Sequence, residues 1–258
     1  MSAVKKNYPS VGILYGGAIW HRDPWQYVFE SFELIDVFKI MQKRFRWAKR
    51  LDLSRYDIVA IGWAPDQIFL KENESEILRF LSMGGILIAL GEFDLNWLPH
   101  TRYMRGFEND IIITGAKDTI FKNLTTKDVS DWDDSAHGYF TSIPPDAKGI
   151  AQIVVNGRKH YVAYIDNERY VGSLLAMTID PDFHTYNGLA SARLMLQNIA
   201  GWAIDEYYRV FQSNLKNLDL AKKLSFRVRP YFVELLAAIM AGILSTIATY
   251  FLLQYFFR

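Results

Sequence analysis

Two carboxylates and an imidazole lie within five residues in the segment Asp180-Pro-Asp182-Phe-His184. Such a cluster could bind a divalent metal ion, or it could transfer protons as a general acid and base. The segment is also typical of a turn, because aspartate side chains accept hydrogen bonds from nearby backbone amides and proline fixes φ. It follows an apolar run that predicts a strand, so in a parallel sheet it would lie at the edge where ligands bind.

His21 is the second candidate, because it follows Gly16-Gly17 at the end of another apolar, strand-like segment. If both strands belong to one parallel sheet, His21 and His184 lie at the same edge. Two imidazoles and carboxylates suit a divalent metal cofactor. The candidate metal ligands are His21, Asp180, Asp182 and His184. A solvated loop histidine is the simpler interpretation of His21, and the amides of Gly16 and Gly17 could instead hold an anion.

The third candidate is the acidic and aromatic segment 131–139, which contains Asp133 and His137. Carboxylates hold hydroxyl groups and aromatic faces stack on rings, so the segment suits a sugar or a cation. A surface loop made acidic for solubility is the alternative. Glu92, which follows a third apolar run, is a further candidate. The candidate ligand-binding residues are Gly16, Gly17, His21, Glu92, Asp133, His137, Asp180 and His184.

The elements that would position these residues follow from apolar runs and their spacing. The segments 10–15, 56–63 and 86–90 are β-branched or apolar throughout, as buried parallel strands are. An asparagine start, an acidic first turn and a stripe of apolar positions predict a helix over 73–83. Alternation of strands and helices predicts an α/β fold with a mostly parallel sheet and helices on both faces.

The remaining soluble segments give further expectations. Residues 25–45 predict mostly helix, and 124–145 is a long polar and aromatic stretch without a clear element. The turn Asn156-Gly157-Arg158 predicts a hairpin between 150–155 and 159–165. Strands are expected over 110–114 and 169–179, and a helix over 187–208.

Composition excludes several classes of function. The formal net charge is +1, which argues against a nucleic-acid partner. The chain has no cysteine, so disulfides, thiolate metal sites and a cysteine nucleophile are excluded. Residues 1–14 contain too short an apolar run for a secretory signal.

The segment Leu235–Phe257 holds 23 residues without a formal charge. At 1.5 Å per residue a helix of this length spans roughly 35 Å, enough to cross the hydrocarbon core of a bilayer. Basic residues crowd 216–229, whereas Arg258 stands alone beyond the far end, so the positive-inside tendency predicts a cytoplasmic N-terminal domain. The sequence predicts a single-pass, tail-anchored membrane protein. A buried core helix is the alternative.

Small residues recur every four positions within this segment, at Ala237, Ala241 and Ser245. This spacing allows close approach of helices and favours a homo-oligomer formed through the span. A simple anchor with incidental small residues is the alternative.

Several ordered motifs resemble the class I glutamine amidotransferase-like superfamily, in particular its trehalose-utilisation-protein-like branch. They are Gly16-Gly17 followed by His21, then YDIVAIGW, then ILRFLSMGGILIALGE, and last GSLLAMTIDPDFH followed by ARLMLQNIAGWA. Together they cover roughly residues 10–205. The resemblance implies a flavodoxin-like sandwich whose ligand site lies at the carboxyl ends of the parallel strands.

The resemblance also shows what this chain lacks. In the amidotransferases a cysteine occupies the sharp turn after the strand 86–90, where this chain has Gly91 and Glu92. Glutamine hydrolysis through a thioester is therefore excluded, and the GxSxG pattern of hydrolases is absent. Glu92 could serve as a nucleophile or base, or only as a cap or an ion-pair partner. The candidate catalytic residues are Glu92, Asp182 and His184.

These observations predict an amidotransferase-like α/β domain over 1–208, a basic juxtamembrane connector over 209–230 and a transmembrane segment over 231–258. The leading hypothesis is a non-catalytic domain at the cytoplasmic membrane face. It would bind a small molecule or a partner, and act through assembly or its transmembrane helix. One alternative is a structural subunit of a membrane complex. The other is a metal- or acid-assisted enzyme on a sugar-like substrate, using His21, Asp180, Asp182 and His184.

Overall fold

The computed structural model describes residues 8–44, 51–63, 65–108 and 110–214. The chain divides into two compact units, Met1–Val210 and Phe211–Arg258. Among the described residues, no helix has both the length and the apolar composition needed to cross a membrane. The span predicted over Leu235–Phe257 and most of the basic connector lie outside the described residues, so both stay predictions.

Five parallel strands form one half of the sheet. In chain order they are β1 (Val11–Tyr15), β2 (Glu33–Asp36), β3 (Ile58–Ile61), β4 (Ile86–Leu90) and β10 (Ser173–Met177). Their spatial order is β2-β1-β3-β4-β10, with every neighbouring pair parallel. With β10 counted as the fifth strand, this is the flavodoxin-like order 2-1-3-4-5. The predicted α/β fold and its parallel sheet are therefore confirmed.

Strand β4 shows why these runs are apolar throughout. Ile86, Ile88 and Leu90 belong to the core on one face of the sheet, and Leu87 and Ala89 to the core on the other. Because successive side chains of a strand point to opposite faces, a strand covered on both sides needs an apolar residue at every position.

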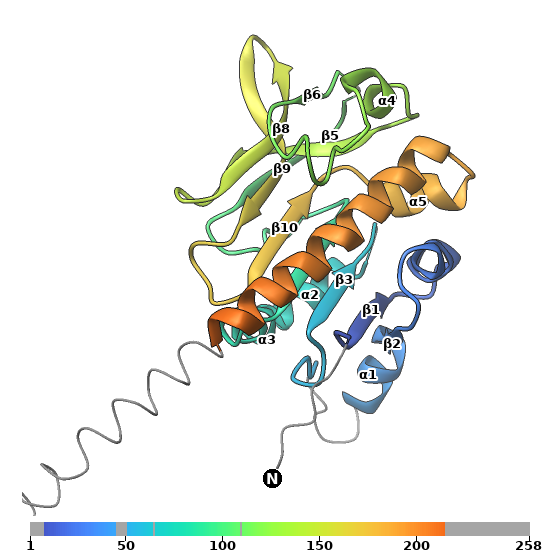
Figure 1. Cartoon of the computed structure of the whole chain (residues 1–258), viewed down its shortest axis with the longest axis vertical. Coiled ribbons are helices and arrows are strands. Elements are labelled where there is room, and N and C mark those ends of the chain that lie inside the picture. Colours follow the sequence, from blue (N-terminus) through green and yellow to red (C-terminus); the bar gives the residue numbers. More distant parts are fainter. Residues whose placement is uncertain (1–7, 45–50, 64, 109, 215–258) are drawn as a thin grey trace, which may run out of the picture. The chain divides into compact units, whose positions relative to one another are not determined.

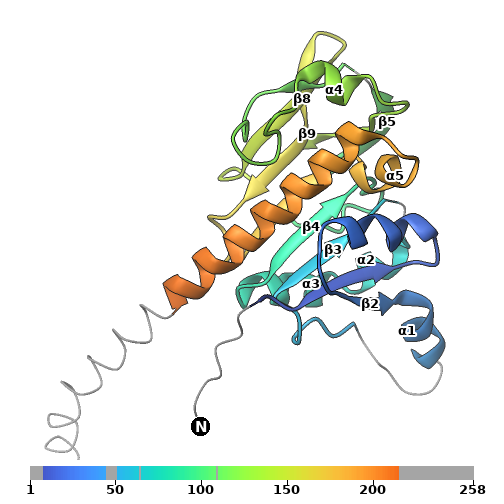
Figure 2. The ribbon, with the colours of Figure 1, turned by 45° about the vertical axis from the view of Figure 1, so that its right-hand side comes forward.

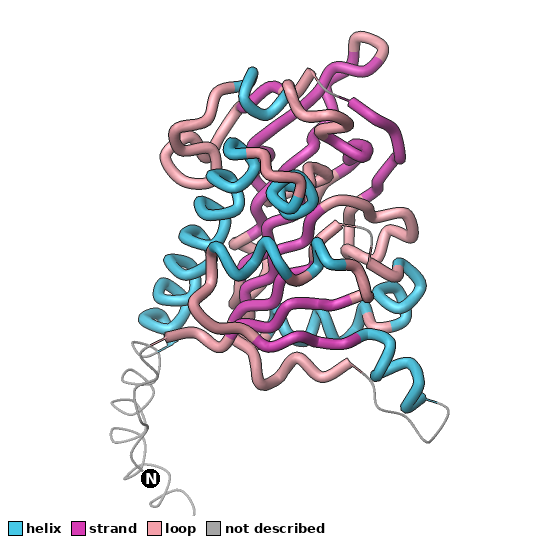
Figure 3. Tube along the Cα trace, turned by 90° about the vertical axis from the view of Figure 1, so that its right-hand side faces the viewer, coloured by secondary structure: helices cyan, strands magenta, loops and turns pink. Residues whose placement is uncertain are grey.

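Helices cover both faces of the sheet (Figures 1, 2 and 3). On one face lies the long helix whose described part covers 190–214, and which buries Met195, Leu196 and Ile199. On the other face lie α2 (Gln67–Glu72) and α3 (Glu74–Ser82). Their buried residues include Leu70, Ile77 and Leu81. Two short 3-10 helices, η1 (Ile19–His21) and η2 (Asp23–Tyr27), join β1 to β2, and α1 (Val37–Arg44) follows β2.

The second half of the sheet is antiparallel and is inserted between β4 and β10. Its elements are β5 (Arg102–Glu108), β6 (Ile112–Ile113), α4 (Thr126–Ser130), β7 (Ala136–Ser142), β8 (Lys148–Val155) and β9 (Arg158–Asp166). The sheet continues from β10 through β9 and β7 to β5, with β8 beside β9. The predicted hairpin is confirmed as β8–β9, and Asn156 and Gly157 turn it with φ of 50° and 74°. After β10 comes the short helix α5 (Pro181–Tyr186).

Two sequence predictions need correction. Residues 25–44 contain the end of η2 and the whole of α1, but they also contain the edge strand β2, paired with β1, which the sequence did not predict. That strand has only four residues, too few for its alternation to be recognised beside a helical pattern. The stretch 124–145 does contain regular elements, α4 and β7, and β7 gains its strand conformation from long-range pairing with β5 and β9.

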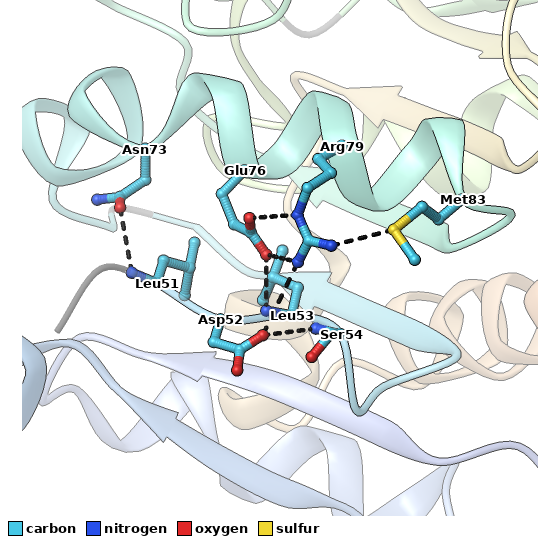
Figure 4. A network of polar contacts seen from close by, with 8 residues as sticks. All are labelled: Leu51, Asp52, Leu53, Ser54, Asn73, Glu76, Arg79 and Met83. Carbon is cyan, nitrogen blue, oxygen red and sulfur yellow. Dashed lines mark hydrogen bonds and ion pairs between the residues drawn. The ribbon is translucent and has the colours of Figure 1, made fainter.

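A polar network fastens the segment before β3 to helix α3 (Figure 4). Glu76 accepts a hydrogen bond from the backbone N–H of Leu53 at 3.0 Å. Arg79 donates to both carboxylate oxygens of Glu76, at 2.8 and 2.7 Å, and reaches the sulfur of Met83 at 3.0 Å. Asn73 accepts from the N–H of Leu51 at 3.2 Å. Because 51–54 leads into β3 and α3 leads into β4, the network lies near the amino ends of both strands.

Candidate functional site

The predicted site residues gather at the opposite edge, beyond the carboxyl ends of the parallel strands. Gly16 follows β1, Trp63 follows β3, Glu92 follows β4, and Asp180 follows β10. His137 joins them from β7 of the antiparallel half. Open α/β sheets bind ligands at this edge, where the strand order reverses.

One buried carboxylate holds two imidazoles. Asp180 lies between Nε2 of His137, 3.0 Å from Oδ2, and Nε2 of His184, 3.3 Å from Oδ1. Asp180 is fully buried, and both histidines are more than nine-tenths buried. The one-turn spacing of Asp180 and His184 across the start of α5 brings these two together, whereas His137 arrives through the isolated bridge of Ala136 with Ile179.

The charges around His137 favour its protonated form. Burial works against protonation, but hydrogen bonding and attraction to Asp180, with the charges of Glu92 and Asp134, outweigh it and raise the pKa of His137. The ring of His137 also stacks on Trp63, with centroids 4.9 Å apart and planes 25° apart. An imidazolium is stabilised in both ways, by carboxylates and by an aromatic face.

A second chain of hydrogen bonds ties three strand ends together without entering this cluster. Asp182 accepts from the backbone N–H of Trp63 at 3.0 Å. His21 contacts the carbonyl of Trp63 through Nε2 at 2.6 Å, and its Nδ1 accepts from the N–H of Gly16 at 3.1 Å. Because Nδ1 is an acceptor here, the proton of the neutral ring is assigned to Nε2. The chain thereby links the ends of β1, β3 and β10.

These bonds give His21 a positioning role. Both of its ring nitrogens are engaged by backbone atoms, and burial lowers its pKa despite the bond to the carbonyl of Trp63. Among the described residues, no three His, Asp or Glu side chains are grouped so that they could hold a metal ion. The four candidate metal ligands are thus divided: Asp180 and His184 meet, and His21 and Asp182 both hold Trp63.

Asp182 is a carboxylate with no cationic partner in the described part of the chain. Burial and the charge of Asp180 raise its pKa to about 7, although the N–H of Trp63 opposes this. Its Oδ1 atom is buried without a hydrogen-bond partner among the described residues. A Cβ atom at Gly62 would overlap the carboxylate, so the close approach of Asp182 to β3 requires glycine there.

A pocket of about 600 Å³ opens beside the His137–Asp180–His184 cluster. Aromatic side chains, both histidines and four carboxylates contribute to its wall. The lining residues are Trp63, Glu92, Asp131, Trp132, Asp133, Asp134, His137, Phe183, His184, Asn187 and Leu189. The third sequence candidate, the segment 131–139, therefore does meet the motif that follows β10.

Aromatic contacts hold the wall of this pocket in place. Trp63 packs against Phe183 with ring centroids 4.6 Å apart, and Trp132 lies 5.0 Å from the ring of His184. The indole N–H of Trp132 donates to the hydroxyl of Ser191 at 2.9 Å. Among the site residues predicted from the sequence, none of these three is named individually. The acidic and aromatic character of segment 131–139 indicated Trp132, and the position of Trp63 at the end of an apolar strand could have indicated it.

The turn after β4 begins with Gly91 and Glu92. Gly91 adopts φ of +87°, and a Cβ atom there would collide with Trp63. The space in which a nucleophilic side chain would project is thus occupied by a tryptophan. Glu92 contacts Arg105 at 2.6 Å, as expected of an ion-pair partner, and its role as a nucleophile or base stays a prediction. Gly16 and Gly17 are not free to hold an anion together, because the N–H of Gly16 donates to His21.

Comparisons with known proteins find remote likeness to solved structures. No protein-family model and no curated protein matches the chain. Among solved structures, the chain is similar to a ThuA-like protein from Bacteroides uniformis, at 11% identity and a TM-score of 0.45, over 77% of this chain and 94% of that one. It is also similar to a cytoplasmic protein from Salmonella typhimurium, at 11% identity and a TM-score of 0.46, over 72% of this chain and 86% of that one.

Proposed function

We propose that the chain is a membrane-anchored, non-catalytic domain of the glutamine amidotransferase-like type, which binds a small polar molecule at the carboxyl edge of its sheet. The observation that carries the proposal is the pocket of about 600 Å³ with its aromatic wall and convergent polar groups. Cavities of this size and composition are typical of small-molecule sites.

Two observations support binding without the chemistry of an amidotransferase. The turn after β4 has a glycine against a tryptophan, and the chain contains no cysteine. The wall of the pocket is also held in a fixed position, because the backbone of Trp63 is bonded through both its N–H and its carbonyl. A preorganised wall lowers the entropic cost of binding a ligand.

The membrane part of the proposal rests on the uncharged segment Leu235–Phe257 and its basic flank. With these as an anchor, the domain lies on the cytoplasmic side, and close packing of the spans would couple ligand binding to assembly. Comparing the full chain with a truncation after Arg229 tests the anchor. Resistance of the full chain alone to carbonate extraction is expected, and equal extraction of both would contradict it.

Ligand binding is tested on the full chain in detergent with a library of polar metabolites, observed by saturation-transfer NMR. A compound that uses the pocket should lose its signal with Asp131→Asn/Asp133→Asn, because both side chains are exposed and line the pocket. The matched control is Asp146→Asn, an exposed aspartate that does not line it. A library without hits, or hits that bind the double variant equally well, would contradict the proposed function.

One observation favours a second candidate, an acid–base enzyme acting on a sugar-like substrate. Asp180 engages Nε2 of His184, and no hydrogen bond involves Nδ1 of His184 within the described residues. A carboxylate that orients an imidazole with a free second nitrogen is the usual arrangement of a general base. If a library compound is turned over, His184→Gln should abolish turnover while leaving binding within a few-fold. Turnover that survives this substitution would exclude His184 as the base.

A further inference from the structure

We propose that the ligand of this pocket is a small organic ammonium ion, held by the carboxylates of segment 131–134 and the aromatic wall, and that its binding displaces a proton from His137. This inference rests on the proposed function, since it names the chemical class of ligand for the same pocket.

The charge of the pocket wall is one-sided. Four carboxylates line it, and no lysine or arginine is among the described residues that do. Arg105 balances one of the four, Glu92, from outside the wall. Within the described residues, Asp131, Asp133 and Asp134 form no ion pair, so a cation entering from solvent would meet their charges uncompensated.

The protonation of His137 reports the negative electrostatic potential of the pocket. His137 lies in the pocket wall, and its protonated form is favoured although the ring is buried. Asp180 faces it from the end of β10, Glu92 from the end of β4, and Asp134 from the segment before β7. The site therefore already stabilises a positive charge on a flat, nitrogen-containing ring.

Two further charged or titratable groups lie near His137 and must be considered. His184 shares Asp180 with it, and Arg105, on the neighbouring strand β5, pairs with Glu92. Arg105 stays positive at all relevant pH values. His184 contacts Oδ1 of Asp180, whereas His137 contacts Oδ2. The sign of the expected coupling follows from the repulsion between two positive charges, the ligand and the protonated ring of His137.

The polar and aromatic geometry fits an ammonium group. His184 is more than nine-tenths buried and lines the pocket. Its Nε2 lies at Asp180, so in the neutral ring Nδ1 is an acceptor that an ammonium N–H can use. The aromatic side chains of the wall attract a cation through the negative faces of their rings. A neutral polyol would gain from the hydrogen bonds but not from the field.

The coupling to His137 has a definite sign. A bound cation repels the proton on His137, so binding lowers the pKa of this ring and releases a proton to solvent. By reciprocity, the affinity for the cation falls as the pH decreases through the pKa of His137. A neutral ligand would show no such dependence, and an anion would show the opposite one.

The test uses matched probes that differ only in charge. Choline is paired with 3,3-dimethylbutan-1-ol and propylammonium with propan-1-ol, each titrated into the full chain in a detergent without choline groups. Because the chain has 5 histidines, their ring signals can be followed by NMR, and His137→Gln assigns the signal of interest. At least one cation should bind in the millimolar range or tighter, lower the pKa of His137 and bind at least about tenfold better than its neutral partner.

A variant locates the effect. The double variant Asp133→Asn/Asp134→Asn should lower the affinity for the cation by about fivefold or more. Two charges are removed together because each partly exposed charge pair contributes little by itself. Asparagine tolerates the positive φ of 52° at Asp134, so the backbone is preserved. Asp146→Asn should leave affinity unchanged. Equal binding of cation and neutral partner, or binding of neither, would overturn the cation inference. The metabolite library with its own variant still decides separately whether the pocket binds a ligand at all.

Discussion

Glu76 on α3 and Asp182 on α5 are carboxylates at opposite edges of the same sheet, and each accepts a backbone hydrogen bond at 3.0 Å. Their acidities nevertheless move in opposite directions. Burial raises the pKa of Asp182 to about 7, and the charge of Asp180 adds to this effect. Burial also acts on Glu76, but hydrogen bonds from Arg79 and Leu53 outweigh it and lower its pKa.

The difference lies in the counter-ion. In the α3 network of Figure 4, the guanidinium of Arg79 meets both oxygens of Glu76, so the network neutralises its own charge. At the carboxyl edge, the groups that favour the ionised form of Asp182 within the described residues are backbone N–H donors, chiefly that of Trp63, and Oδ1 has no hydrogen-bond partner there. A bare backbone donor does not compensate for complete burial of a carboxylate.

The Glu76–Arg79 network has the properties of a structural contact, whereas the carboxyl edge of the sheet has those of a ligand site. A polar network that only joins two segments is self-contained, as the network of Glu76 and Arg79 is. The carboxyl edge has carboxylates in excess, ring nitrogens around a single Asp180, and a pocket beside them. Burial of a carboxylate without a counter-ion is costly, and groups perturbed in this way cluster at functional sites.

The largest effect is expected from Asp182→Asn. The folded state binds the proton of Asp182 up to a pH of about 7, whereas the unfolded chain releases it near its ordinary value of 3.8. The stability that this group contributes is therefore complete below pH 3.8 and is lost as the pH rises through 7. The loss amounts to about 4 kcal/mol as an upper figure.

Chemical unfolding of the full chain between pH 4 and 8 measures this dependence. The free energy of unfolding of Asp182→Asn should lack that decline, so its advantage over the parent chain grows with pH. Asp146→Asn, at an exposed aspartate, serves as the control. If the free energies of unfolding of Asp182→Asn and the parent change in parallel with pH, Asp182 is ionised in the folded state without an energetic cost. The proposed contrast between Asp182 and Glu76 would then be wrong.

Much of the fold could be predicted from the sequence because it is encoded locally. The run Ile86–Leu90 is apolar at each position since both faces are covered, and Asn156-Gly157 favours a hairpin by its conformational preference alone. The strand β2 could not be predicted, because four residues carry little pattern and its conformation depends on pairing with β1.

The sequence indicated the sheet edge at which candidate residues would lie, but not the contacts that their side chains make. Strand ends indicated the edge where Asp180 and His184 would lie, and the structure adds His137, which the sequence offered only as part of segment 131–139. The sequence could not show that Asp182, two residues from Asp180, turns instead to Trp63, 119 positions earlier in the chain. That choice depends on how α5 sits against β3, which no local pattern records.

Gly62→Ala should have the next largest effect, a destabilisation of about 1–3 kcal/mol from overpacking. The added Cβ atom would displace the carboxylate of Asp182 from the N–H of Trp63. Gly106→Ala, in strand β5, is the matched control because a Cβ atom there meets nothing within 4 Å. In an Asp182→Ala background the cost of Gly62→Ala should shrink. An unchanged cost in that background would mean that the clash is not with Asp182.

Glu76→Gln should cost about 1 kcal/mol at pH 7, because the amide keeps an acceptor for Leu53 but loses the charge that Arg79 pairs with. Since the pKa of Glu76 is lowered in the folded state, this stability is present above its unfolded value and is lost as the pH falls through the folded one. The unfolding curves of variant and parent should therefore converge in acid. Glu168→Gln, at an exposed glutamate, is the control. Neither Glu76→Gln nor Glu168→Gln should change the affinity of the pocket for its ligand. A change with Glu76→Gln would mean that the Glu76–Arg79 network is coupled to the pocket.

Asp52→Asn should have the smallest effect, below about 0.5 kcal/mol. Asp52 lies 3.9 Å from Arg79, and the side chains are 72% and 45% exposed, so water and salt screen the pair. Asparagine can still accept the hydrogen bond that the N–H of Ser54 donates to Asp52 at 3.0 Å. Urea unfolding at 0.1 and 1 M salt measures the difference, which should vanish at the higher concentration. A loss above 1 kcal/mol that persists in salt would show that Glu76 alone does not neutralise Arg79. The network would then depend on a charge outside its buried pair, and it would no longer be the self-contained counterpart of the site at the opposite edge.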